Sequence, residues 1–70
     1  MMPLVYAEPE QESVIQKIGG SPKTRKHLEN IGFVVGGTVT VLTTVNGNLI
    51  VKVKEARVAL DYEMAKKIMI

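Results

Sequence analysis

The chain lacks cysteine and tryptophan, and it contains only one phenylalanine and two tyrosines among its 70 residues. Without cysteine it can form neither a disulfide nor a thiolate metal site. A chain of this length buries only about 60% of the surface that its unfolded form exposes, so its core is small. Its stability must therefore come from a tightly packed small barrel or from self-association.

Long hydrophobic runs and a basic beginning are also missing. The first ten residues, MMPLVYAEPE, contain no Lys or Arg and no extended apolar stretch, so we predict neither a signal peptide nor a membrane anchor. No apolar run in the chain approaches the roughly 20 residues that a membrane-spanning helix needs. Together with the missing cysteine, these features favour a cytoplasmic protein.

Acidic residues are scarce after the beginning of the chain. Glu8, Glu10 and Glu12 precede all nine Lys and Arg residues, so only four of the seven acidic residues lie in the rest of the chain with these nine basic ones. The net charge of the whole chain is +2. A basic body of this kind can bind nucleic acid, an acidic protein or a membrane headgroup, or can simply keep the protein soluble. Because single-strand binders normally supply aromatic platforms for base stacking, nucleic-acid binding is disfavoured.

The chain is predicted to form one domain over residues 1–70. Pro3 and Pro9 indicate an extended N-terminal arm over residues 1–10, because proline interrupts a helix at both positions. The loosely alternating run Glu12 to Ile18 predicts the first strand.

One short helix with both ends marked follows this strand. Ser21 is a favourable N-cap, and Pro22 stands at the first helical position, where a helix tolerates proline. Gly32 fits the position just past the helix end, with Phe33 placed to pack back on Leu28. The sequence therefore predicts a helix over residues 21–31 whose buried stripe consists of Thr24, Leu28 and Ile31.

Most of the remaining chain is predicted to be strand. Thr38 to Val45 and Asn48 to Lys54 both alternate, and Asn46-Gly47 lies between them. A two-residue loop would put the apolar rows of these strands on opposite faces of the sheet, because a slip of one residue reverses every side chain. We therefore predict a three-residue loop with a bulge, or a bulge within one strand.

The end of the chain adds three shorter elements. Arg57 to Leu60 is predicted to be a strand, Asp61 caps a helical turn near residues 61–66, and Ile68 to Ile70 forms a last strand. About five short strands with one helix predict a mainly β fold, a small SH3-like barrel.

No catalytic arrangement is visible along the chain. His27 is the only histidine, and it has no cysteine or second histidine to complete a transition-metal site. The two Gly-Gly pairs are too short to cradle a phosphate. We predict no catalytic residue, no cofactor and no metal ligand, and therefore a protein that is not an enzyme.

The order of these patterns resembles the FeoA family, the small cytoplasmic component of bacterial ferrous iron transport. The run HLENIGFVVGGTVTVL is similar to its signature, and the tail RVALDYEMAKKIMI is similar to its closing pattern. Two positions depart from the family: Val35 replaces the usual proline before Gly36, and Glu10 replaces a frequent glycine before the first strand. The matching positions are Leu28, Ile31, Gly32, Phe33, Gly36, Ala59, Leu60, Ala65 and Ile68.

The resemblance implies an SH3-like domain with a non-enzymatic, accessory role in Fe(II) uptake. It also implies a partner, the cytosolic G-protein region of the membrane transporter FeoB. An apolar patch with a charged border is typical of an interaction site. We expect such a surface to combine one face of the helix with the outer face of the sheet, at residues Lys23, Lys26, His27, Leu42, Ile50 and Lys52.

Other functions stay open at this point. One is a metal-responsive regulatory or oligomerisation domain, like the SH3-like C-terminal domain of metal-dependent repressors. Another is a basic barrel that binds nucleic acid. Formation of a homo-oligomer through exposed strand edges is also open.

Overall fold

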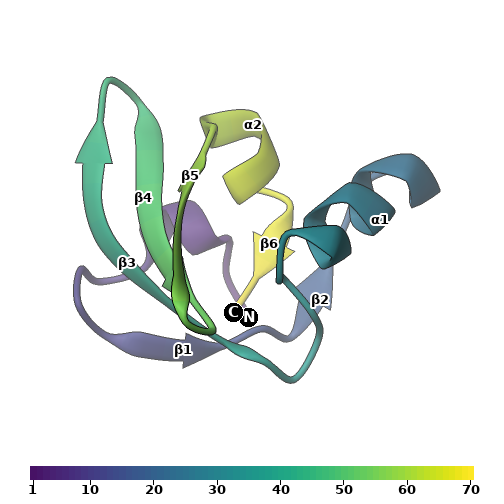
Figure 1. Cartoon of the computed structure of the whole chain (residues 1–70), viewed down its shortest axis with the longest axis horizontal. Coiled ribbons are helices and arrows are strands. Elements are labelled where there is room, and N and C mark those ends of the chain that lie inside the picture. The colour runs from purple at the N-terminus through teal and green to yellow at the C-terminus, as the bar shows by residue number, and fades with distance from the viewer.

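A computed structural model describes residues 1–70. It contains six strands in two antiparallel sheets, two α-helices and one 3-10 turn (Figure 1). The larger sheet has the strand order β1-β3-β4-β5, and β2 pairs with β6. The elements are η1 (Leu4–Tyr6), β1 (Glu12–Val14), β2 (Lys17–Ile18), α1 (Pro22–Asn30), β3 (Thr38–Val45), β4 (Asn48–Val53), β5 (Ala56–Leu60), α2 (Tyr62–Ala65) and β6 (Ile68–Met69).

The mainly β prediction is confirmed, with two corrections to its strands. There are six strands rather than about five, and the two sheets do not close into one hydrogen-bonded barrel. The predicted strand Glu12–Ile18 changes sheets at its middle. The Ile15 N–H donates to the Gly37 carbonyl at 2.8 Å, whereas the Gln16 N–H donates to the Met69 carbonyl at 2.7 Å.

The first ten residues do not form the expected extended arm. They include the turn η1, which places the Leu4 side chain in the core with 1% of its surface exposed. Met2 and Ile70 exchange two backbone hydrogen bonds of 2.8 Å, so the two termini lie side by side (Figure 1). Burial of Leu4 offsets the loss of chain freedom and ties this segment to the body.

The ends of α1 are formed as the sequence predicts. The Thr24 N–H donates to Ser21 Oγ at 3.2 Å, which satisfies one of the free donors at the helix start. At the other end, Gly32 has φ +112° and its N–H donates to the Glu29 carbonyl at 3.0 Å. The Phe33 N–H reaches the Leu28 carbonyl at 2.9 Å, and these two bonds together form a Schellman motif.

The β3–β4 hairpin confirms one of the two predicted solutions. Val45 pairs with Asn48 across a two-residue loop, in which Asn46 and Gly47 have φ +51° and +81°. The three-residue loop is therefore wrong, because the Asn-Gly pair satisfies the backbone of a type I′ turn. The register instead shifts between Val41 and Thr43, so Leu42 is the bulge that brings the apolar rows together.

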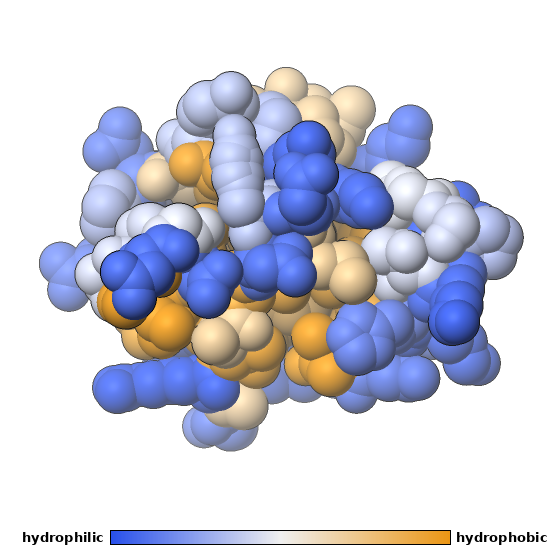
Figure 2. Space-filling model, turned by 90° about the horizontal axis from the view of Figure 1, so that it is seen from above, coloured by the Kyte–Doolittle hydropathy of each residue, from blue (hydrophilic) through white to orange (hydrophobic).

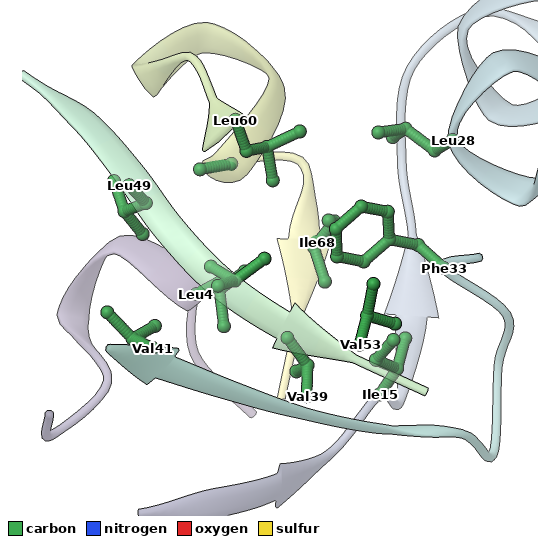
Figure 3. Close-up of a cluster of buried hydrophobic side chains, with 12 residues drawn as sticks. Leu4, Ile15, Leu28, Phe33, Val39, Val41, Leu49, Val53, Leu60 and Ile68 are labelled. Atoms are coloured by element: carbon green, nitrogen blue, oxygen red, sulfur yellow. The ribbon is translucent and has the colours of Figure 1, made fainter. Parts of the chain in front are cut away.

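The core lies between the two sheets and is wholly apolar. Leu28 of α1 and Phe33 of the loop that follows are both fully buried and point into it (Figure 3). The helical turn α2 is capped as expected, since the Met64 N–H donates to Asp61 Oδ1 at 2.7 Å, and it buries Ala65 completely. Neither helix of the structure has the length and hydrophobicity needed to cross a membrane. The twelve buried residues are Leu4, Ile15, Leu28, Phe33, Val39, Val41, Leu49, Val51, Val53, Leu60, Ala65 and Ile68.

Candidate functional site

The three predicted contact residues of the helix, Lys23, Lys26 and His27, are all exposed. Helix α1 projects from one end of the molecule, at the right of Figure 1. Seen from above, this end is covered mainly by hydrophilic residues (Figure 2). None of the three side chains forms a hydrogen bond or ion pair within the chain, so the two lysine ammonium groups and the imidazole ring remain available to a partner.

The three predicted contact residues of the sheet lie on β3 and β4. Leu42 is the half-buried bulge residue, Ile50 is half-buried, and Lys52 is exposed. Ile50 pairs with Thr43 on one side and with Ala59 on the other, and both of these residues are exposed. Ile50 therefore belongs to the outer face of the larger sheet.

The structure separates the two groups of predicted contact residues. Strands β3 and β4 lie at the left of Figure 1, whereas α1 projects at the right. A partner that touches both groups must therefore contact α1 as well as the larger sheet.

A shallow polar hollow lies on the outer face of the larger sheet. Its volume is about 310 Å³, and none of its lining residues is hydrophobic. Lys52 is the one predicted contact residue in it. The lining residues come from β1, β3, β4 and the β4–β5 turn, and they are Glu12, Thr38, Thr40, Lys52, Lys54 and Glu55. The outer face of the sheet, defined here by this hollow and by Ile50, Arg57 and Ala59, is the first candidate site.

A second hollow of about 250 Å³, which no pattern in the sequence predicts, lies between η1, the hairpin tip and α2. Its walls include Tyr6 and Tyr62, which are 66% and 44% exposed, beside the buried Leu49. Lys66 Nζ lies 6.0 Å from the centre of the Tyr62 ring and 2.9 Å from Glu63 Oε2. The hydrogen bond that the Lys66 ammonium donates to the Glu63 carboxylate raises the pKa of Lys66 above its ordinary value. The only sign of this hollow in the sequence is that two of the three aromatic residues, Tyr6 and Tyr62, have no predicted place in the core.

Metal-ligating side chains are not clustered in the structure. The structure contains no group of three or more His, Cys, Asp or Glu side chains that could hold a metal ion. His27, the single histidine, stands exposed on α1. What the surface can do chemically is bind, through lysine and arginine cations, threonine hydroxyls and a few apolar side chains.

Comparison with known proteins identifies relatives of the whole chain. The model of the FeoA domain family matches residues 2–70. The Fe(2+) transport protein A candidate of Methanocaldococcus jannaschii is 29% identical over 70 residues, which cover 100% of this chain and 85% of that protein.

Solved structures share the fold. An iron uptake regulatory protein (FeoA) superposes with a TM-score of 0.86 at 27% identity, over 96% of this chain and 89% of that one. The zinc complex of Stenotrophomonas maltophilia FeoA, described as an SH3 domain protein, superposes with a TM-score of 0.83 at 23% identity, over 99% of this chain and 88% of that one.

A metal-dependent repressor contains a domain of the same fold. A manganese-dependent transcriptional repressor superposes with a TM-score of 0.84 at 20% identity, over 94% of this chain but only 38% of the repressor. At this identity the likeness concerns the fold alone, which is SH3-like. Since the FeoA model spans nearly every residue, the chain belongs to the FeoA family.

Proposed function

We propose that this chain is a non-enzymatic accessory module of ferrous iron uptake that binds the cytosolic G-protein region of an FeoB-type transporter. The observation that carries the proposal is the match of the FeoA family model to residues 2–70. Two relatives support it through their names, one as an Fe(2+) transport protein A candidate and one as a candidate ferrous iron transport activating factor. A binding role also agrees with a surface that offers charged and apolar contacts.

The proposed contact is the outer face of the larger sheet. Ile50 and the bulge residue Leu42 supply apolar surface there, and Val45 at the end of β3 is 49% exposed. Lys52 lies two positions from Ile50 on the same strand, so side-chain alternation puts both on one face. Protein interfaces combine an apolar centre with a polar rim in this way. The cations of α1 form a second, separate contact.

A titration of the purified cytosolic G-protein region with this chain tests the proposal, and calorimetry measures the affinity. The double variant Leu42→Glu, Ile50→Glu is expected to lose binding, because two buried carboxylates at an interface remain unpaired. Both residues are half-buried, so the variant needs a circular-dichroism check of its fold. The more exposed Val45→Glu is a second variant that leaves the core untouched.

A matched control changes the other end of the molecule. Lys23→Glu, Lys26→Glu reverses two exposed charges on α1 and tests the helix as a contact. Full binding by Leu42→Glu, Ile50→Glu and by Val45→Glu rejects the sheet face, and no binding by the unmodified chain rejects the proposed partner.

The fold shared with repressors suggests the rival function of a metal-responsive domain. That function requires measurable metal affinity, whereas we expect no heat on titration with Fe(II), Mn(II) or Zn(II), because no ligand cluster is assembled. Micromolar binding of any of these ions would favour the rival.

A further inference from the structure

Three cations on the outer face of the sheet have no partner within the chain. Lys52 and Arg57 stand directly opposite each other on β4 and β5. Like charges in this position destabilise a sheet. The only ion pair in the structure joins Lys66 to Glu63, so neither Lys52 nor Arg57 forms an ion pair. Lys54, in the adjacent turn, is also unpaired.

Lys54 is held in a backbone conformation that disfavours any side chain. It has φ +55° at the first position of the two-residue β4–β5 turn, between the paired Val53 and Ala56. Glycine or asparagine adopts this conformation far more readily than lysine. Strain of this kind and a like-charge pair therefore occur at one place on the surface. Such costs concentrate where a protein binds a ligand.

The lining of the polar hollow indicates the class of ligand. The hydroxyls of Thr38 and Thr40 lie beside Lys52 and Lys54, and none of these side chains makes a hydrogen bond within the chain. No aromatic side chain lines the hollow, so a nucleic-acid base has nothing on which to stack. The carboxylates of Glu12 and Glu55 can accept hydrogen bonds from the backbone amides of a peptide, which a phosphate group cannot donate.

We infer that the outer face of the larger sheet binds an acidic, extended segment of a partner protein, with its carboxylates on Lys52, Lys54 and Arg57. In an extended segment, side chains two residues apart point the same way and lie about 6.7 Å from each other. Alternating acidic residues therefore present successive carboxylates to the face. The identity of the partner protein rests on the proposed function, whereas the acidic chemistry of the bound segment does not.

The probe is a peptide of about ten residues that alternates Glu and Ser, so that it presents carboxylates on one side when extended. It is titrated into the isotopically labelled chain at about 20 mM salt, where surface charges are weakly screened, and amide shifts are followed by NMR. Shifts confined to β3, β4 and β5, and an affinity that falls as salt is added, are the expected result. The absence of shifts on these strands overturns the inference.

Variants separate a specific site from general attraction to a basic protein. Lys52→Gln, Arg57→Gln should weaken peptide binding about five- to tenfold. The same variant should fold at least as well as the parent, because it removes a like-charge pair. Lys23→Gln, Lys26→Gln removes the same charge from α1, which projects from one end of the molecule and is not part of this face (Figure 1), so it should weaken binding less than Lys52→Gln, Arg57→Gln does. Equal weakening by both variants overturns the inference.

The variant Lys54→Gly distinguishes a lysine that binds the peptide from one that only occupies the turn. It should raise the melting temperature, because it relieves the positive φ, and at the same time weaken peptide binding. A rise in melting temperature with unchanged binding overturns the role of Lys54. If a thymidine oligonucleotide binds more tightly than the Glu-Ser peptide, and Lys52→Gln, Arg57→Gln abolishes that binding, the ligand of this face is a nucleic acid and the inference is overturned.

The two proposals fail separately. If the peptide binds at this face but the cytosolic G-protein region does not bind, the partner is wrong and the inference stands. If the G-protein region binds and its affinity is the same for Lys52→Gln, Arg57→Gln as for the parent, the inference is wrong and the proposed function stands.

Discussion

Replacement of Glu10 by glycine is expected to stabilise the protein. Glu10 has φ +65° and occupies the third position of a turn in which the Gln11 N–H donates to the Glu8 carbonyl at 3.4 Å. Pro9 in the second position and a left-handed residue in the third define a type II turn, whose third position favours glycine. The departure of Glu10 from the family pattern therefore coincides with a strained backbone.

The expected change in the free energy of unfolding is the difference between two opposing contributions. A left-handed backbone costs an ordinary residue about 1–2 kcal/mol, and glycine gives back about 0.4–1 kcal/mol through its greater freedom in the unfolded chain. The exposed Glu10 side chain makes no hydrogen bond or ion pair, whereas its N–H bond to the Val41 carbonyl at 2.7 Å belongs to the backbone and is retained. We expect a net gain of about 0.5–1 kcal/mol, or about 3–6 °C in melting temperature.

Thermal unfolding followed by circular dichroism measures the effect. Glu12→Gly is the matched control, because Glu12 lies in β1 opposite Thr40, and glycine within a strand should cost about 0.5–1 kcal/mol. Glu10→Ala removes the same charge without relieving the backbone and should bring no gain. A melting temperature that falls in Glu10→Gly, or that rises equally in Glu10→Ala, would refute the reasoning.

Two further stability changes follow from the other turns. Val35→Pro should raise the free energy of unfolding by about 0.4–1 kcal/mol. Val35 is the second position of a type II turn in which the Gly37 N–H donates to the Val34 carbonyl at 3.0 Å, and the Val35 N–H makes no backbone hydrogen bond that proline would remove. A lower urea midpoint would contradict this prediction. Gly32→Ala should cost about 1 kcal/mol or more in urea unfolding, because φ is +112° while the added Cβ would meet Val53 at an ordinary 3.5 Å; an unchanged midpoint would show that the Schellman turn contributes nothing.

Local chemistry predicts the features of the fold that depend on neighbouring residues. The cap at Ser21 and the left-handed Gly32 are decided within a few residues, so the ends of α1 are where the sequence places them. The bulge at Leu42 follows from a conflict that the sequence already contains, between an Asn-Gly turn and the alternation of two strands.

Features that depend on distant partners could not be predicted. Leu4 is buried because the C-terminal strand pairs with the segment beside it, and no pattern in the first ten residues encodes that partner. The change of sheet after Ile15 likewise depends on Met69. Tyr6 and Tyr62 border a common hollow only because η1 and α2 are neighbours in the folded chain. The predicted contact residues of helix and sheet, conversely, lie on separate elements, with α1 projecting away from β3 and β4 (Figure 1).

The measurement that tests the central claim most directly is a titration of the isotopically labelled chain with the cytosolic G-protein region of an FeoB-type transporter. We expect saturable changes at the amides around Ile50, Lys52 and Arg57 on the outer face of the sheet. If no amide on β3, β4 or β5 responds to a folded, nucleotide-loaded domain, the claim that this face serves iron uptake by binding the transporter is contradicted.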